Sequence, residues 1–267
     1  MSRLRLLTAF SRNSLLVSSF VLLVSIVVLW PRLRPAVPSS DSEQHQHAFS
    51  ARILSYDPLM IHLENFISKS EREHLLRLGQ SSFEASKVTE WDGTNVISED
   101  RTSSTAHLPN GDPIVERIIS RASEFQGYTS RGDHEVLQLT RYRAGQKFEP
   151  HWDHDQIAPP EDESRQALTE AESRQRLTTI FAVLEASCEE CGTRFPSLSV
   201  DWEQEDRRWC RFVDCEDKEG ITVRAIPGNA LFWKNFNSSN GGDERTLHAG
   251  LPPETGVKTG LNIWTLM

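Results

Sequence analysis

The sequence predicts an α+β domain built around a β-barrel or jelly-roll core. Two helical patterns come first in the body of the chain, and many short β-branched or aromatic runs separated by turn residues follow them. The body runs from about Ala51 to the C-terminus, a length that one domain can hold. The net charge is −9 and no long basic run lies outside the N-terminal arginines, so nucleic acid is not the expected partner.

The N-terminal part of the chain differs from the body. Ser14–Trp30 reads SLLVSSFVLLVSIVVLW, an uncharged stretch near the shortest length that spans a bilayer. The flanking arginines and the N-terminal amine favour a cytoplasmic N-terminus and a luminal body. We therefore expect residues 1–34 to be a cytoplasmic tail and a single transmembrane signal anchor in the endoplasmic reticulum membrane. A cleaved signal peptide and a buried core helix are the alternatives.

A stem leads from this anchor into the domain. Residues 35–50 are rich in proline, serine and other polar residues and show no periodicity, which is typical of a linker. Residues 51–267 then form the predicted domain.

The two predicted helices have clear start signals. The run LMIHLENFIS predicts a strand leading into a helix over about Glu71–Gln80, with Ser68 or Ser70 as the N-cap. The run NGDPIVERIISRASEF predicts the second helix, because Asp112 is placed to cap it and Pro113 to occupy its first position.

Short strands follow the helices. The runs that predict them are EVLQLTRY, TTIFAVLEA, GITVRAIP, NALFWKN and GLNIWTLM. Between the first two runs, the acidic and polar segment Ile157–Arg176 is too long for a hairpin and predicts an insertion.

Metal-ligating residue types cluster just after the first of these strands, in RYRAGQKFEPHWDHD. Alternate residues of an extended chain point the same way, so His151 and Asp153 share one side, and Trp152 and His154 the other. A histidine and a carboxylate placed together supply two thirds of the two-histidine, one-carboxylate triad that binds non-haem Fe(II). An acidic, solvated turn is the alternative interpretation. His154 breaks the His-x-Asp spacing, so we expect His154 and Asp155 at the rim of the site.

The third ligand must come from far along the chain. The segment DERTLHAGLPPETGVKTGLNIW provides His248, and Lys258 follows on the next predicted strand, from which it can reach the same pocket. A buried lysine there needs an anionic partner, because an unpaired ammonium group in an apolar barrel is very costly. The pattern is therefore His-x-Asp, a long gap, a histidine and then a lysine.

With these motifs the chain resembles the prolyl 4-hydroxylase branch (alpha-subunit-like) of the 2-oxoglutarate- and Fe(II)-dependent dioxygenases. The matching segments, in order along the chain, are RTSSTAHL, LQLTRYRAGQKFEPHWDHD, IPGNALFWKN and LHAGLPPETGVKTGLNIW. Several ordered matches over most of the body are more specific than any single motif. The resemblance implies a double-stranded β-helix (jelly-roll) core with supporting N-terminal helices.

The resemblance also implies roles for individual residues. His151, Asp153 and His248 would be the iron ligands. Lys258 would hold the distal carboxylate of 2-oxoglutarate, and Tyr142 is placed like the tyrosine that helps to bind it.

Two further positions match the family. Trp264 corresponds to a tryptophan near the pocket, and Thr193 to the threonine of a G-G-x-T-x-F-P segment. This chain departs from the pattern here, because EECGTRFP lacks the glycine pair. The departure affects a loop near the mouth of the pocket and removes no predicted ligand.

The implied reaction is hydroxylation of a protein substrate, with peptidyl proline as the target. It would consume 2-oxoglutarate and O₂, release succinate and CO₂, and use ascorbate to rescue iron oxidised in uncoupled turnovers. The alternatives are the same chemistry on another residue, a catalytically inactive β-helix module that binds peptides or glycans, and a zinc hydrolase. A zinc hydrolase would need a general base that Asp155 supplies poorly, and it would leave Lys258 without a role. The sequence makes no prediction of the oligomeric state.

The four cysteines occur as Cys188-x2-Cys191 and Cys210-x4-Cys215. Two disulfides are the simplest interpretation for a luminal protein, with a zinc site or free thiols as alternatives. Spacing leaves the pairing open among three connectivities. Asn237-Ser238-Ser239 is a glycosylation sequon.

Overall fold

The computed structural model describes residues 47–89, 94–127, 129–130, 133–154 and 175–267. The predicted anchor lies outside these residues, as do the stem up to residue 46 and the insertion up to residue 174. Within the described part of the chain, no helix is both long and apolar enough to cross a membrane. The residues from His47 onward form one structural unit.

An eight-stranded antiparallel sheet carries most of this unit. Its strands are β1 Ser50–Tyr56, β2 Leu59–Glu64, β3 Glu84–Ala85, β6 Ser104–His107, β7 Gln138–Arg143, β9 Arg176–Ala186, β12 Ala230–Lys234 and β14 Val257–Leu266. The strand order is β1-β2-β12-β9-β14-β7-β6-β3, with the two longest strands paired near the centre. Strand β1 begins at Ser50, the last residue of the predicted stem, and Arg176 begins β9.

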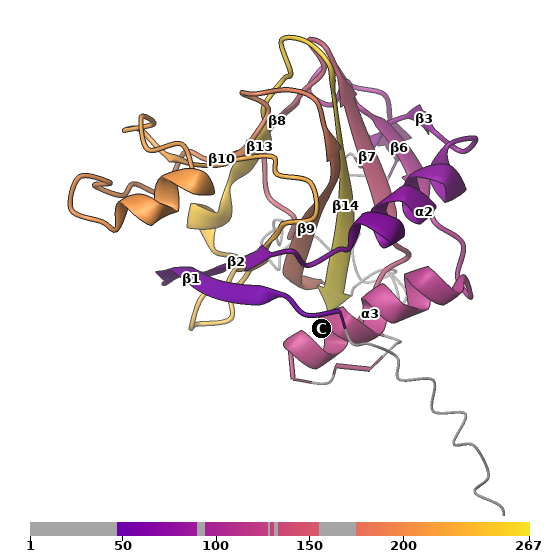
Figure 1. The fold of residues 1–267 in the computed structure, drawn as a ribbon, viewed down its shortest axis with the longest axis horizontal. Coiled ribbons are helices and arrows are strands. Elements are labelled where there is room, and N and C mark those ends of the chain that lie inside the picture. The colour runs from indigo at the N-terminus through magenta and orange to yellow at the C-terminus, as the bar shows by residue number, and fades with distance from the viewer. Residues whose placement is uncertain (1–46, 90–93, 128, 131–132, 155–174) are drawn as a thin grey trace, which may run out of the picture. The chain divides into compact units, whose positions relative to one another are not determined.

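A smaller antiparallel sheet packs near the large one (Figure 1). Its strands are β8 Phe148–His151, β10 Thr193–Phe195, β11 Ile221–Val223 and β13 His248–Gly250, in the order β11-β10-β13-β8. The remaining elements are a hairpin of β4 Val88–Thr89 and β5 Asn95–Val96 and two 3₁₀ helices, η4 Arg207–Arg211 and η5 Glu244–Thr246.

Two helices, α2 Lys69–Gly79 and α3 Pro113–Phe125, lie along the large sheet (Figure 1). Ser68 caps α2 and forms a capping box with Glu71, which satisfies otherwise unpaired N–H groups of the first turn. Asp112 caps α3, and Pro113 takes the first helical position. Both predicted helices and their caps are confirmed.

The alternation of side chains along the strands builds the core and the pocket at once. On β14, Leu261 and Ile263 are fully buried in the apolar cluster that includes both helices. Lys258, Asn262 and Trp264 lie on the other face of the same strand and line a pocket. Since successive residues of a strand face opposite ways, β14 contributes one face to the apolar core and the other to the pocket.

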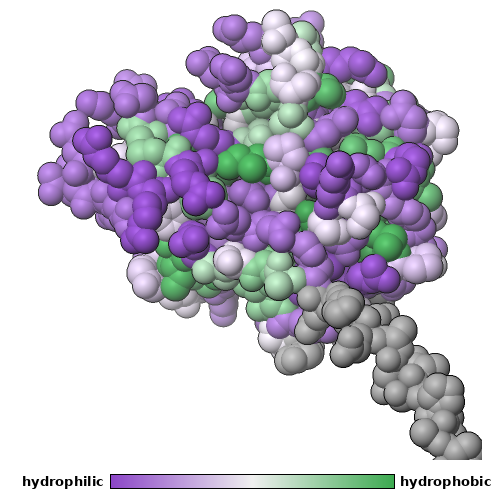
Figure 2. All heavy atoms as spheres, in the orientation of Figure 1, coloured by the Kyte–Doolittle hydropathy of each residue, from purple (hydrophilic) through white to green (hydrophobic). Residues whose placement is uncertain are grey.

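A second apolar cluster lies between the two sheets. Met60 and Trp233 of the large sheet contact Phe195 and Ile221 of the small one, and all four are almost completely buried. The face of the molecule shown in Figure 2 is mostly hydrophilic, with small hydrophobic patches between the hydrophilic residues. Few large apolar side chains of the described residues are exposed, and the predicted α+β domain with a jelly-roll core of two packed sheets is confirmed.

Candidate active site

A pocket of about 610 Å³ lies between the large sheet and the small sheet. Every residue to which the sequence assigns a metal or cosubstrate role lies on its wall. These residues are Tyr142, His151, Asp153, Thr193, His248, Lys258 and Trp264.

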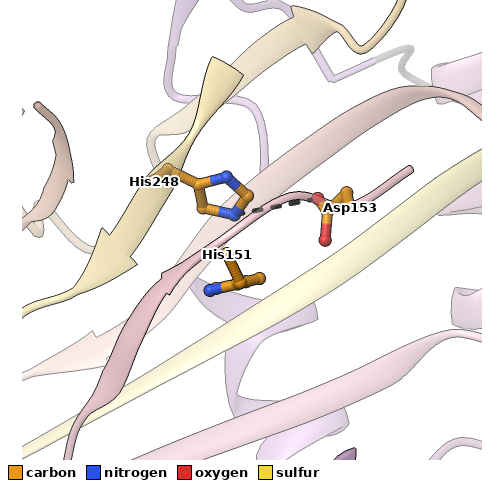
Figure 3. Close-up of side chains that lie close together, drawn as sticks. All are labelled: His151, Asp153 and His248. Carbon is orange, nitrogen blue, oxygen red and sulfur yellow. Dashed lines mark ion pairs between the residues drawn. The ribbon is translucent and has the colours of Figure 1, made fainter. Parts of the chain in front are cut away.

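The three predicted metal ligands come together in this pocket. His151 ends β8, Asp153 follows two residues later, and His248 begins β13 (Figure 3). One potential ligand atom from each residue lies within 4.8 Å of the others. His248 Nε2 and the nearer Asp153 oxygen are 3.9 Å apart. The donor set is two imidazoles and one carboxylate on one side of a cavity, which fits a non-haem Fe(II) site.

Backbone carbonyl groups fix the orientation of both histidine rings. His151 Nδ1 lies 2.8 Å from the Glu149 carbonyl oxygen, and His248 Nδ1 lies 3.0 Å from the Thr246 carbonyl oxygen. A carbonyl oxygen only accepts, so each Nδ1 must carry the proton and donate it. The Nε2 lone pairs are therefore available for a metal ion, as in other histidine metal sites.

The charge states of His151 and Asp153 also suit metal binding. Burial lowers the pKa of His151 to about 3, so its ring is neutral at physiological pH. Burial alone would raise the pKa of the Asp153 carboxyl, but neighbouring His248, Arg176 and His151 hold it below its usual value. His151 and Asp153 are therefore present as neutral imidazole and ionised carboxylate, the forms that bind cations.

Lys258 lies on the wall of the same pocket. Its side chain is 1% exposed, and its ammonium group donates to the Gly192 carbonyl oxygen at 3.0 Å. It also lies 4.6 Å from the centre of the Tyr142 ring. Burial alone lowers the pKa of Lys258 to about 7, and no carboxylate in the described part of the chain lies within ion-pair distance. The lysine is thus placed to receive an anion.

Tyr142, Thr193 and Trp264 complete the predicted set around the lysine and the triad. Tyr142 is 4% exposed, and burial raises the pKa of its phenol to about 12, so the phenol stays protonated. Thr193 opens β10, where it pairs with Gly250 of β13. Trp264 stacks under the Arg176 guanidinium, whose carbon lies 3.6 Å from the ring centre.

One expectation about the rim is wrong. His154 is buried, with 8% of its surface exposed, and its ring packs against Phe236. A Cβ on Gly242 would lie 2.3 Å from a carbon of this ring, so the absence of a side chain there makes room for the histidine. His154 does not belong to the group of potential metal ligands, and Asp155 lies outside the described residues.

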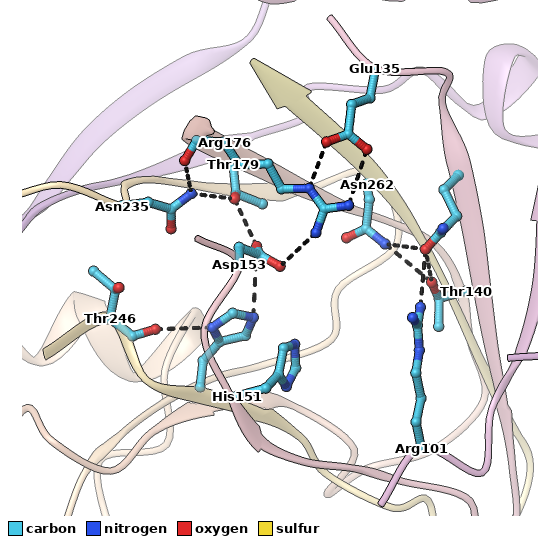
Figure 4. A network of polar contacts seen from close by, with 12 residues as sticks. Arg101, Glu135, Thr140, His151, Asp153, Arg176, Thr179, Asn235, Thr246 and Asn262 are labelled. Carbon is cyan, nitrogen blue, oxygen red and sulfur yellow. Dashed lines mark hydrogen bonds and ion pairs between the residues drawn. The ribbon is translucent and has the colours of Figure 1, made fainter. Parts of the chain in front are cut away.

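The structure adds residues that the motifs did not single out. Arg176 makes a two-bond ion pair with Glu135, at 2.7 and 3.0 Å, next to Asp153 (Figure 4). Phe148 stacks on the His151 ring with centroids 3.4 Å apart. The only sequence signals were that Arg176 is the last residue of the predicted insertion and that Phe148 lies close to the His-x-Asp motif.

The cysteines form two disulfides, Cys188–Cys191 and Cys210–Cys215. The zinc and free-thiol alternatives are therefore excluded in this structure. The first disulfide precedes Gly192, whose carbonyl oxygen accepts from Lys258. In the sequon, Asn237 Oδ1 accepts hydrogen bonds from the Ser239 and Gly241 N–H groups, at 2.9 and 3.2 Å.

Comparison with known proteins identifies the family. No family model matches the chain. Prolyl 4-hydroxylase 5 of Arabidopsis thaliana is 30% identical over 239 residues, which cover 87% of this chain and 76% of the relative. Probable prolyl 4-hydroxylase 8 of the same plant is 31% identical over 219 residues, covering 79% of this chain and 70% of the relative.

A solved structure agrees with this at the level of the fold. The viral collagen prolyl hydroxylase vCPH from Paramecium Bursaria Chlorella virus-1, in its 2OG complex, superposes with a TM-score of 0.52 and is 20% identical. The match covers 78% of this chain and 95% of the viral chain, and it confirms the double-stranded β-helix core. The chain therefore belongs to the prolyl 4-hydroxylase family and is a 2-oxoglutarate- and Fe(II)-dependent dioxygenase.

Proposed function

We propose that this enzyme hydroxylates peptidyl proline in a protein or peptide substrate and releases succinate and CO₂. His151, Asp153 and His248 hold the iron, and Lys258 holds the distal carboxylate of 2-oxoglutarate. The relatives named above are prolyl 4-hydroxylases, which supports proline as the target.

The observation that carries this proposal is the position of Lys258. A cation buried in an apolar barrel is unfavourable unless an anion joins it. The metal-ligand set and the lysine line one pocket of about 610 Å³. A cosubstrate with one carboxylate near the metal and another at the far end satisfies both groups.

The chemistry comes from the bound groups, and the chain positions and shields them. Fe(II) and 2-oxoglutarate together activate O₂ and supply the oxidising power for a C–H bond. The two Nδ1–carbonyl hydrogen bonds hold the imidazole Nε2 atoms toward the metal position. Tyr142 and Thr193 shape the wall near Lys258, and Trp264 borders the pocket beside Asp153. We also propose that ascorbate restores iron oxidised in uncoupled turnovers.

The test uses the full chain, loaded with Fe(II) under anaerobic conditions and supplied with 2-oxoglutarate, O₂, ascorbate and proline-rich peptides. We expect succinate in step with a +16 Da product, at a hydroxyproline, in mass spectra. His248→Ala should abolish both signals, and Lys258→Met should raise the KM for 2-oxoglutarate strongly. Lys218→Met, at an exposed lysine, is the matched control.

Other outcomes would separate the alternatives. Succinate with a hydroxyl group on a residue other than proline would keep the reaction and replace the target. Folded, iron-loaded enzyme that releases no succinate would favour a binding module.

We further propose that residues 1–34 anchor the enzyme in the endoplasmic reticulum membrane with the domain in the lumen. The two disulfides favour an oxidising compartment. In that case the Asn237 sequon is accessible to glycosylation. A mobility shift after glycosidase treatment of protein from microsomes, lost in Asn237→Gln, would support the orientation, and protease sensitivity of the domain in sealed microsomes would refute it.

A further inference from the structure

Behind the predicted metal ligands lies a chain of buried hydrogen bonds that starts at Asp153. The Thr179 hydroxyl of β9 donates to Asp153 Oδ2 at 2.7 Å. The Asn235 side-chain amide, just beyond β12, donates to that hydroxyl at 3.0 Å and to the Arg176 carbonyl oxygen at 2.9 Å (Figure 4). Thr179 and Asn235 are both 0% exposed.

The same chain continues to the other side of the site. The Asp243 backbone N–H donates to the Asn235 carbonyl oxygen at 2.9 Å. The Thr246 hydroxyl donates to the Asp243 carbonyl oxygen at 2.7 Å, and the Thr246 carbonyl oxygen accepts from His248 Nδ1. Asp153 and His248, which come from different segments, are thereby joined through buried groups.

The direction of each hydrogen bond follows from the atoms involved. The Thr179 hydroxyl has one proton, and an ionised carboxylate only accepts, so that proton goes to Asp153. Both amide protons of Asn235 are then used, one on the Thr179 oxygen and one on the Arg176 carbonyl oxygen. Flipping the Asn235 amide would place its oxygen against that carbonyl oxygen, so only one orientation is favourable.

We propose that Thr179 and Asn235 are positioning residues that fix the Asp153 carboxylate for metal binding. A carboxylate held by a hydrogen bond at one oxygen has already lost rotational freedom before the metal ion binds. Metal binding therefore costs less conformational entropy. This inference rests on the proposed role of His151, Asp153 and His248 as the metal ligands. It assigns a part in metal affinity to one residue of β9 and to the residue that follows β12, and neither segment's sequence indicates that role.

The test compares Thr179→Val, which keeps the shape but removes the donor, with Thr179→Ser, which keeps the donor. Thr178→Val is the matched control, because the Thr178 hydroxyl bonds Gln126 away from the site. Metal-free protein is titrated with Mn(II), and free Mn(II) is followed by electron paramagnetic resonance. The d–d absorption of the Co(II)-loaded protein reports the ligand geometry.

We expect Thr179→Val to weaken Mn(II) binding by roughly tenfold or more and to change the Co(II) spectrum. Thr179→Ser and Thr178→Val should bind Mn(II) like the wild type. Melting temperatures of the metal-free variants show whether Thr179→Val folds; if it does not, Thr179→Cys, with a weak donor of similar size, should give intermediate affinity.

Unchanged Mn(II) affinity and an unchanged Co(II) spectrum in a folded Thr179→Val variant would overturn the positioning role. That result would leave the proposed function intact as long as His248→Ala loses the metal. If the single variant His248→Ala bound Mn(II) as tightly as the wild type, the assigned ligand set would instead be refuted.

Discussion

His151 and His248 lie directly opposite each other in the ladder between β8 and β13, with their ring centroids 4.3 Å apart. Strand pairing, rather than local spacing, therefore brings the two imidazoles together. Asp153 joins them from the segment just after β8. A metal ion at this position would link two strands of the small sheet, so its binding should be visible in the stability of the domain.

We expect Mn(II) to raise the melting temperature of the metal-free protein. An ion that binds only the folded state stabilises it by about 2.7 kcal/mol at a concentration 100 times its Kd. His248→Ala should remove this stabilisation, because the remaining pair has too few ligands. Thermal unfolding followed by circular dichroism, with and without Mn(II), measures the effect.

His47→Ala is the control for this experiment, since His47 is a histidine of the same domain that hydrogen-bonds the Asn65 carbonyl group. It should retain the full Mn(II)-dependent rise. An equal rise in His248→Ala would show that the ion binds elsewhere.

The affinity for 2-oxoglutarate should fall as the pH rises above neutrality. The pKa of Lys258 in the free protein is lowered by burial to about 7, and a bound carboxylate favours the protonated form. Between pH 7 and 9 the free enzyme loses this proton, so the KM should rise, approaching tenfold per pH unit. Steady-state kinetics at saturating Fe(II) and peptide measure it.

Lys258 also makes the stability of the ligand-free protein depend on pH, but stability should rise with pH whereas the affinity for 2-oxoglutarate falls. Lys258 stays protonated in the unfolded chain up to about pH 10.5. Because the unfolded state binds more protons between about pH 7 and 10.5, this residue makes the ligand-free protein more stable as the pH rises through that range. Lys258→Met should remove both pH dependences, and a KM in the wild type that does not change with pH would contradict the proposed role.

The features that the sequence predicted correctly have strong local signals. Ser68 and Asp112 are residue types that commonly cap helix N-termini, and each precedes a helix. The long strands β9 and β14 are rich in β-branched and aromatic residues. His151 and Asp153 could be assigned because both belong to one short motif. His248 was chosen because Lys258 follows it on the next predicted strand, and the family resemblance then supported that choice.

Features that depend on contacts between distant segments were not predictable. Strands β10 and β13 have three residues each, too few for a recognisable alternation. Thr179 looks like any strand threonine, and only the fold places its hydroxyl against Asp153. His154 was expected at the rim because it breaks the His-x-Asp spacing. Nothing in the sequence shows that its ring packs against Gly242.

The buried ion pair between Glu71 and Arg121 should be a major contributor to the stability of the helical layer. Arg121 Nη2 lies 2.7 Å from Glu71 Oε1, with both side chains less than 10% exposed. Burial alone would raise the pKa of Glu71, but hydrogen bonds from Arg121 and Ser68 lower it to about 2. Arg121→Met should cost about 3–5 kcal/mol at pH 7, because it leaves a buried carboxylate without its partner.

The sign of the pH effect follows from the lowered pKa of Glu71. Its contribution is present above the unfolded pKa of about 4.5 and is lost as the pH falls toward 2. Urea unfolding from pH 7 to pH 3 should therefore show a smaller penalty for Arg121→Met at the acid end. The double variant Glu71→Gln/Arg121→Met should regain part of the loss, and a penalty that is independent of pH would contradict this explanation.

Gly260 should be a position where a single methyl group disturbs the pocket. A Cβ at this residue would lie 2.0 Å from the Phe181 ring, which lines the pocket. Gly260→Ala must displace that ring, so we expect a loss of stability of about 1–3 kcal/mol and a raised KM for 2-oxoglutarate. Phe181→Leu in the Gly260→Ala background should recover part of both effects, because it removes the obstructing ring atoms.

Gly127→Ala is a poor control because of its positive φ, whereas Ala186→Gly, at the end of β9, tests backbone freedom near the same ladder. Urea unfolding and kinetics on Gly260→Ala, the double variant and Ala186→Gly would decide the matter, since equal losses in the single and double variants would mean that Phe181 is not the residue displaced.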